Sequence, residues 1–312
     1  MARLRAVAVL LALALVACSG SDDPEPRAAP PTSVAAAAPV CAPGTLGTRS
    51  YTLCTAGEAR GQGLIVALHG RGSSGAEMQA MTALEVPAAA AGYAVVYPDA
   101  LVGAWGDDTF PTDSRPVGDE DVVFLDSLVA ALHRDPRIGD GPVGLVGFSN
   151  GGGMALRYAA QRPEAVRAVV SVAGQLPRDP AVRPTGRVPL LSVHGDADPI
   201  RPYATGNPEP PTRVQGQSTP TLSTPETVAA FAGPDAAHSA PEASDPEPGD
   251  GTSVLTERWS DEDGTRVVLQ TVVGGGHTWP SARTALPPGF GSLSHDLDAS
   301  AEAVTFVSDL AI

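Results

Sequence analysis

The sequence contains no lysine. All 20 of its basic residues are arginine, against 35 Asp and Glu, and the formal net charge is −15 at pH 7. Without lysine the chain has neither a Schiff-base amine nor the lysine of a phosphate-binding loop. The acidic balance disfavours nucleic acid and anionic membranes, because both attract positive charge. We therefore expect no nucleic-acid partner.

Aromatic residues are also scarce, at 4% of the chain, which argues against a broad platform for stacking sugars or bases. The chain has only three cysteines, with neither a second cysteine pair nor clustered histidines at metal-ligand spacing, so we expect no metal site. Hydrophobic residues nevertheless make up 43% of the 312 residues, which is enough for a substantial buried core.

The N-terminus predicts export. Residues 1–17 have the form of a signal peptide, in which Arg3 and Arg5 precede an apolar stretch too short to span a bilayer comfortably. The stretch ends in LVAC, which resembles the lipobox of bacterial lipoproteins and implies lipidation of Cys18. We expect a cell-envelope lipoprotein that contacts the membrane only through this anchor; plain secretion, with Cys18 incidental, is the alternative.

The remaining chain predicts one domain. Residues 18–40, rich in Pro, Ala and Ser, predict a disordered tether, and residues 41–312 predict a single folded domain. Cys41 and Cys54 form an even pair in an exported chain, so we predict a disulfide between them, with two unpaired thiols as the alternative.

Apolar runs alternate with helical patterns. We expect strands over residues 49–53, 63–68, 94–97, 143–146, 168–172 and 189–193, and helices over 75–91, 119–133 and 299–310. This alternation indicates an α/β fold, with a mostly parallel twisted sheet covered by helices on both faces. A proline-rich insertion over 204–252 interrupts it; we expect a short helix over 225–231 there and otherwise loop, before two more strands over 253–259 and 266–273.

The sequence G-F-S-N-G at residues 147–151 lies between a predicted strand and a predicted helix. This is the context of a nucleophile elbow, in which a tight turn holds a serine where a base can reach it. Ser149 is the candidate nucleophile, and a glycine-rich turn without catalytic role is the alternative.

An activated serine needs a base and an orienting acid. His277 follows a strand through three glycines and is favoured over His295 as the base. Either Asp196 or Asp198, at the end of the strand over 189–193, could be the acid. We interpret the nearby His194 as a support of that turn. Strand-end functional groups of this kind gather at one edge of a parallel sheet.

The remaining candidates concern the substrate. Backbone N–H groups of Asn150 and Arg71 are expected to form the oxyanion hole, although Arg71 could equally serve only to pair with Glu77. Trp279 and Trp105 are candidates for a substrate pocket, with core packing as the equal alternative.

Several motifs together resemble a known family. H-G at 69–70, Y-P-D at 97–99, G-F-S-N-G-G at 147–152, H-G-x-x-D at 194–198 and G-G-G-H-T-W-P at 274–280 are similar to the secreted polyhydroxybutyrate depolymerase-like esterases, a group of the α/β-hydrolases that includes feruloyl and acetylxylan esterases. The resemblance covers about residues 48–312. It implies the α/β-hydrolase fold, with Ser149 as nucleophile, His277 as base and Asp198, rather than Asp196, as acid.

The function expected from these observations is an extracytoplasmic serine esterase that works through an acyl-enzyme without metal or organic cofactor. The resemblance implies hydroxyalkanoate oligomers, or feruloyl and acetyl esters of polysaccharides, as substrates. An acyltransferase with the same triad is the first alternative, and a non-catalytic binding lipoprotein is the second. We expect the protein to be a monomer.

Overall fold

The computed structural model describes residues 38–57, 61–107, 119–178, 181–206, 220–262, 264, 266–285 and 287–309. The predicted signal peptide, Cys18 and the tether up to residue 37 lie outside these ranges, as does part of the proline-rich insertion, residues 207–219. The described residues belong to one compact unit, Ala36–Ile312. None of their helices is long and apolar enough to cross a membrane.

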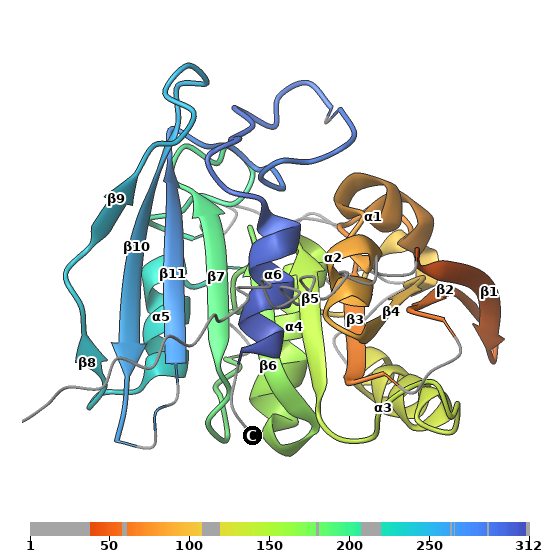
Figure 1. The fold of residues 1–312 in the computed structure, drawn as a ribbon. Coiled ribbons are helices and arrows are strands. Elements are labelled where there is room, and N and C mark those ends of the chain that lie inside the picture. The colour runs from red at the N-terminus through yellow and green to blue at the C-terminus, as the bar shows by residue number, and fades with distance from the viewer. Residues whose placement is uncertain are drawn as a thin grey trace, which may run out of the picture. The chain divides into compact units, whose positions relative to one another are not determined.

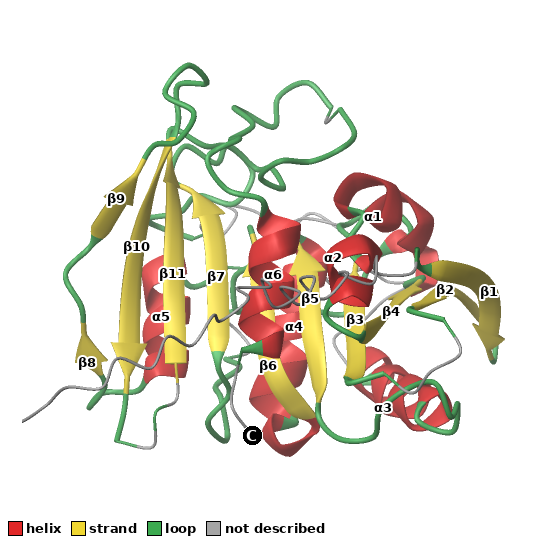
Figure 2. Ribbon diagram, viewed as in Figure 1, coloured by secondary structure: helices red, strands yellow, loops and turns green. Residues whose placement is uncertain are grey.

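An 11-stranded sheet runs through the described residues in the order β1-β2-β4-β3-β5-β6-β7-β11-β10-β8, with β9 also paired to β10 (Figures 1 and 2). The strands are β1 Val40–Leu46, β2 Arg49–Thr55, β3 Gly63–Leu68, β4 Tyr93–Pro98, β5 Val143–Phe148, β6 Val166–Val172, β7 Leu190–Gly195, β8 Ala237–His238, β9 Glu242–Ser244, β10 Ser253–Ser260 and β11 Arg266–Val273.

The middle of the sheet is parallel, from β4 through β3, β5, β6 and β7 to β11. Every residue of β3, β4, β5 and β7 is buried, which explains why the sequence shows these strands as continuous apolar runs without alternation. Antiparallel strands flank this centre on both sides. The carboxyl ends of the parallel strands therefore meet along one edge, where the candidate residues were predicted to gather.

Helices cover both faces of the sheet, which confirms the predicted fold class. In Figure 1, α1, α2 and α6 lie in front of the sheet and α3, α4 and α5 behind it, and buried side chains of each group pack into a separate core cluster. The helices are α1 Gly75–Thr82, α2 Glu85–Ala90, α3 Glu120–Leu132, α4 Asn150–Gln161, α5 Thr224–Ala232 and α6 Ala299–Ser308, with short 3-10 turns at η1 Leu101–Gly103 and η2 Pro163–Ala165.

The single helix expected over residues 75–91 is two helices. Ala83 ends α1 in the left-handed conformation, with φ of 43°. A continuous helix would place Pro87 four residues after Ala83, where a proline ring clashes with the carbonyl and no N–H is available to bond it. With the break at Ala83, Pro87 lies in the first turn of α2, where it is tolerated.

The insertion over 204–252 is more ordered than expected. The helix predicted over 225–231 is present as α5, and a capping box between Ser223 and Glu226 defines its start. The remainder was expected to be loop, but β8 and β9 pair with β10. These short strands supply hydrogen-bond partners for part of the outer edge of β10. Strands of two or three residues are too short to show a recognisable pattern in the sequence.

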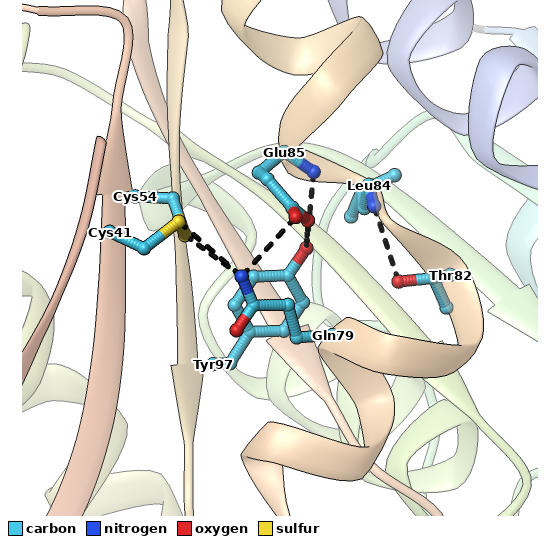
Figure 3. Close-up of a disulfide and its surroundings, with 7 residues drawn as sticks. All are labelled: Cys41, Cys54, Gln79, Thr82, Leu84, Glu85 and Tyr97. Atoms are coloured by element: carbon cyan, nitrogen blue, oxygen red, sulfur yellow. Dashed lines mark hydrogen bonds between the residues drawn. A yellow bond between two sulfur atoms is a disulfide. The ribbon is translucent and has the colours of Figure 1, made fainter. Parts of the chain in front are cut away.

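The disulfide predicted between Cys41 and Cys54 is present. The first predicted strand, 49–53, is preceded by β1, and the two cysteines lie opposite each other in the β1–β2 register. The Gln79 side chain of α1 contacts both sulfur atoms, at 3.3 and 3.4 Å, and donates to Glu85 of α2 (Figure 3). The disulfide thus joins the two strands of the outermost hairpin, and Gln79 connects this hairpin to the helices beside it.

Candidate active site

Ser149 occupies a strained turn between β5 and α4. Its φ and ψ are 55° and −115°, a conformation that residues with a side chain rarely adopt. The backbone N–H of Ser149 donates to the Val172 carbonyl of the neighbouring strand, at 2.8 Å, and its carbonyl accepts from Gly153. The turn is therefore held from both sides, as the motif predicts for an elbow.

Glycines are required at this elbow by close backbone contact. A Cβ atom at Gly147 would lie 2.2 Å from the Gly151 carbonyl oxygen, and one at Gly151 would lie 2.1 Å from the carbonyl oxygen of Leu68. Both distances are far below van der Waals contact. A Cβ at Gly153 would lie 2.6 Å from the carboxylate of Asp107. The glycines thus let α4 begin directly against β3 and β5.

The serine, the histidine and the aspartate predicted to act together do lie together. His277 Nε2 is 2.8 Å from the Ser149 hydroxyl oxygen, and His277 Nδ1 is 2.6 Å from Asp198 Oδ2. The imidazole lies between the rings of Phe148 and Phe290, with centroid distances of 5.3 and 5.6 Å. Because the Asp198 carboxylate accepts a hydrogen bond from Nδ1–H, Nε2 carries no proton and faces Ser149 as an acceptor.

The structure also distinguishes between the alternatives for acid and base. Asp196 lies apart from the imidazole and accepts a hydrogen bond from the Gly274 backbone N–H, at 2.7 Å, so it fixes the turn that leads to His277. His295 is exposed, and its backbone N–H donates to Asp250. Neither side chain is hydrogen-bonded to the triad, whereas Asp198 and His277 are both buried within it.

Burial and hydrogen bonding set the protonation states. Burial lowers the pKa of His277, and the hydrogen bond and charge of Asp198 only partly oppose this. Burial also opposes ionisation of Asp198, but hydrogen bonds from His194 and His277 outweigh it and hold the pKa of that carboxyl far below its usual range. The site therefore holds a neutral imidazole beside an ionised carboxylate, which is the combination that general base catalysis needs.

The loop after β3 lies beside Ser149. The Ala100 N–H donates to His69 Nε2, at 3.1 Å, so the ring proton of His69 is on Nδ1 and is donated to the Gly70 carbonyl, at 2.7 Å. In a trans peptide the carbonyl of Gly70 and the N–H of Arg71 point in opposite directions. His69 thereby fixes the direction of the Arg71 N–H, one of the two predicted oxyanion donors.

The other predicted donor is the N–H of Asn150, the first residue of α4, which has no acceptor within the helix because of its position. The side chain of Asn150 has a separate role that the sequence did not reveal. It accepts from the Trp105 N–H at 2.7 Å and donates to the Trp105 carbonyl at 3.1 Å, fully buried. The side-chain amide of Asn150 thus satisfies both the backbone N–H and the carbonyl of Trp105.

A cavity of about 560 Å³ opens above Ser149 and His277. Apolar side chains of its wall come from α1, from the loop after His277, from β5 and from the loop after Asp198; they include Met78, Met81, Phe148, Ile200, Ala285 and Phe290. Arg71 lies at the same opening. This volume suits a small organic group, and the largely apolar wall favours an uncharged one.

Trp105 and Trp279, which were candidates for the pocket, do not line this cavity. Trp105 is 2% exposed and donates its indole N–H to the His69 carbonyl, and Trp279 is fully buried and donates to Ser300. Both indoles find internal acceptors, so the alternative of core packing is correct.

His194 supports the turn of the acid as predicted, because its Nε2 lies 3.1 Å from Asp198 Oδ2 and 3.0 Å from the Arg201 carbonyl oxygen. Other residues behind the site were not predicted, and among them Thr224 of the insertion contacts His194. A buried ion pair between Arg201 and Asp107, at 3.1 Å, joins the acid loop to the loop after β4. Thr224 and Asp107 are far from their partners in sequence and carry no motif. No group of three or more His, Cys, Asp or Glu among the described residues is arranged to hold a metal ion.

Comparison with known proteins places this arrangement in a family. Residues 63–208 match the family described as alpha/beta hydrolase fold. NocK of Nocardia uniformis subsp. tsuyamanensis, named as a candidate esterase, is 39% identical, and the alignment covers 97% of this chain and 96% of NocK. The chain belongs to the α/β-hydrolase family.

Solved structures agree with the fold of this α/β-hydrolase. The crystal structure of esterase PE8 is similar with a TM-score of 0.50 at 20% identity, covering 83% of this chain and 97% of that one. Within the α/β-hydrolase family, membership of the narrower group suggested by the sequence motifs stays a prediction.

Proposed function

We propose that this α/β-hydrolase is a serine esterase that works through an acyl-enzyme. The observation that carries the proposal is the continuous hydrogen-bonded series Ser149–His277–Asp198 at the floor of an open cavity. This order of residues along the chain, after β5, β7 and β11, is that of the α/β-hydrolase triad. The candidate esterase NocK supports the same reaction class.

The mechanism follows from the protonation states. Ser149 attacks the ester carbonyl carbon while His277 Nε2 takes the hydroxyl proton, and Asp198 stabilises the imidazolium that forms. The imidazolium then donates this proton to the leaving alcohol. Water, deprotonated by His277, attacks the acyl carbon; the bond to the Ser149 oxygen then breaks, the imidazolium returns its proton to that oxygen, and the acid is released. These steps need no cofactor.

The negative charge on the carbonyl oxygen in both tetrahedral intermediates requires two N–H donors. We assign them to the backbone of Asn150, at the start of α4, and of Arg71, whose direction His69 fixes. The side chain of Arg71 is exposed and lies at the cavity, where it can face substrate.

The apolar cavity wall supports an ester with an uncharged organic acyl or alcohol group. The family resemblance in the motifs suggests hydroxyalkanoate oligomers, or feruloyl and acetyl esters of polysaccharides. An extracytoplasmic location is supported by the Cys41–Cys54 disulfide, because such bonds persist mainly in oxidising compartments. Anchoring through Cys18 remains part of the proposal; loss of acyl labelling and membrane retention in a Cys18→Ala variant would test it.

The decisive experiment compares p-nitrophenyl acetate and butyrate hydrolysis by the native protein and by Ser149→Ala. We expect the variant to lose about 10⁴-fold or more in kcat. Equal rates in the two proteins would rule out the proposal. Product analysis with an added alcohol distinguishes hydrolysis from acyl transfer, and a panel of feruloyl, acetylated xylan and hydroxybutyrate esters identifies the preferred acyl group.

A further inference from the structure

The carboxylate of Asp198 is fully occupied by hydrogen-bond donors. Oδ1 accepts from the backbone N–H groups of Ile200 and Arg201, at 2.7 and 2.8 Å. Oδ2 accepts from His277, at 2.6 Å, and faces His194 Nε2, at 3.1 Å. A carboxylate has about four acceptor positions, so each is filled here. One of these contacts comes from a second buried histidine that the triad does not include.

Acceptors around His194 identify which of its nitrogens carries the proton. Nε2 lies 3.1 Å from Asp198 Oδ2 and 3.0 Å from the Arg201 carbonyl oxygen. Both partners can only accept, so Nε2 is a donor. On the opposite side of the ring, Nδ1 lies 2.7 Å from the Thr224 hydroxyl oxygen. The state of Nδ1 therefore depends on which way that hydroxyl points.

A carbonyl group determines that direction. The Pro202 carbonyl can only accept, so the amide nitrogen of Gln175 faces it, at 3.1 Å. The same nitrogen donates to Thr224 Oγ1, at 3.2 Å, which directs the threonine proton to His194 Nδ1. The amide oxygen of Gln175 is in turn bonded by the Thr221 hydroxyl, at 2.7 Å. Every donor in this series points toward Asp198.

We propose that His194 is a positioning residue for the triad and that the Gln175–Thr224 hydrogen bonds hold it neutral, as a fixed donor to Asp198. The proposal rests on the proposed function, since it describes how the acid of that triad is oriented. It also gives the proline-rich insertion a role, because Thr221 and Thr224, the first residue of α5, both belong to it.

Neutrality is what makes a second histidine compatible with catalysis. A protonated His194 would neutralise Asp198 and remove the charge that stabilises the His277 imidazolium. The charged and titratable residues that contact this ring are Asp198, at Nε2, and Tyr203, whose ring stands edge-on at 5.8 Å; Arg201 meets it through its backbone carbonyl, and His277 lies on the other side of Asp198. The carboxylate thus lies on the Nε2 side of the ring, and the Thr224 hydroxyl proton is directed at Nδ1 on the opposite side.

The first test separates donation from packing at His194. Glutamine can place an amide N–H where His194 Nε2 donates, whereas leucine removes the donor and keeps the volume. We expect His194→Gln to keep kcat within a few-fold, and His194→Leu to lose about 10- to 100-fold, the equivalent of one hydrogen bond to a charged group. KM should not change, because His194 does not line the cavity. Equal losses in the two variants, or none in His194→Leu, would overturn the proposal.

The second test addresses neutrality with the pair Thr224→Val and Thr224→Ser. Valine removes the hydroxyl at nearly constant volume, so His194 Nδ1 becomes free to bind a proton. Protonation of His194 would then inactivate the enzyme in addition to protonation of His277. We expect the acid side of the kcat/KM profile to steepen from one proton to two in Thr224→Val only. This pair decides the matter if His194→Leu fails to fold. A one-proton profile in Thr224→Val would contradict the proposal.

A measurement without substrate distinguishes this proposal from the proposed function. Proton NMR of the intact protein should show one histidine more titrating between pH 5 and 8 in Thr224→Val than in the native chain or in Thr224→Ser. Should native protein and Ser149→Ala prove equally inactive on esters, the esterase proposal fails while this measurement still reports on His194. No additional titrating histidine would overturn the inference by itself.

Discussion

The two halves of the candidate site are built by different physical means. On the nucleophile side, β5, Ser149 and α4 are consecutive in sequence, and their geometry depends on the absence of side chains at Gly147 and Gly151. On the acid–base side, Asp198 and His277 follow different strands, and hydrogen bonds across long sequence separations hold them. The first half is fixed by sterics within one motif, and the second by polar contacts between segments.

This difference predicts how each half should fail. An added side chain at the elbow must displace the backbone, and the closely packed interior leaves no room for this. Such a change should therefore lower the free energy of unfolding. Loss of one donor or acceptor on the acid–base side leaves the backbone in place and should cost rate. The predictions below test this division, from the largest expected effect to the smallest.

The largest effect is expected at the acid. Asp198→Asn keeps the size of the side chain but presents an amide to His277, which stabilises the wrong tautomer and leaves no charge for the imidazolium. We expect kcat to fall about 10⁴-fold, the equivalent of roughly 5.5 kcal/mol of transition-state stabilisation. The melting temperature should change little. A large fall in melting temperature together with the loss of rate would contradict the division between the two halves.

The elbow should respond in the opposite sense. Gly151→Ala places a Cβ 2.1 Å from the Leu68 carbonyl oxygen, so we expect the free energy of unfolding to fall by more than about 4 kcal/mol, or the protein not to fold. Gly249→Ala is the matched control, since a Cβ there meets nothing within 4 Å, and should lie within about 0.5 kcal/mol of native. Urea unfolding measures both; a stable Gly151→Ala variant would contradict the steric account.

Asn150 belongs to both halves, because its N–H is assigned to the oxyanion and its side chain to structure. Asn150→Ala leaves the N–H and carbonyl of Trp105 buried without their amide partner, at a cost of about 2–4 kcal/mol of stability. The backbone N–H remains, so kcat should fall far less than in Ser149→Ala. Denaturant titration and ester hydrolysis on one preparation check this; comparable losses of kcat would assign catalysis to the side chain.

The smallest effect is a displacement of the pH profile. Burial lowers the pKa of His277 below its usual value of 6.5, so the neutral base persists to lower pH. The acid side of the kcat/KM profile should therefore have its midpoint below pH 6.5. Asp198 raises this pKa, so the residual activity of Asp198→Asn should extend to still lower pH. Circular dichroism at each pH excludes acid unfolding; a native midpoint above 6.5 would show that the Asp198 contribution outweighs burial.

The same division explains what the sequence could predict. Buried strands, their alternation with helices and the elbow all depend on residues close together in the chain, and each was predicted from residues near its final position. Ser149 and His277 were predicted because they follow strands that the α/β topology brings to one edge. The same argument left Asp196 and Asp198 as alternatives for the acid, and the family resemblance chose Asp198. The break at Ala83 was missed because apolar periodicity continued across it, although Pro87 carried the signal.

The support of the acid could not be predicted in this way. Thr224 reaches His194 only through the path of the insertion, and a lone threonine after a proline-rich stretch has no distinguishing pattern. Trp105 and Trp279 are a second example, because the sequence left substrate contact and core packing as equal alternatives. Both indoles donate to internal acceptors, which only the packed structure reveals.

The Cys41–Cys54 bond determines how mechanical load enters the domain. β1 is the outermost strand, whereas β2 is paired on both sides, with β1 and β4. If the cysteines were reduced, tension applied through the N-terminal segment would break the β1–β2 hydrogen bonds one after another. With the disulfide formed, the tension passes from Cys41 to Cys54, in a strand that is hydrogen-bonded to both β1 and β4. A chain pulled from its N-terminus is thus protected at its edge strand β1.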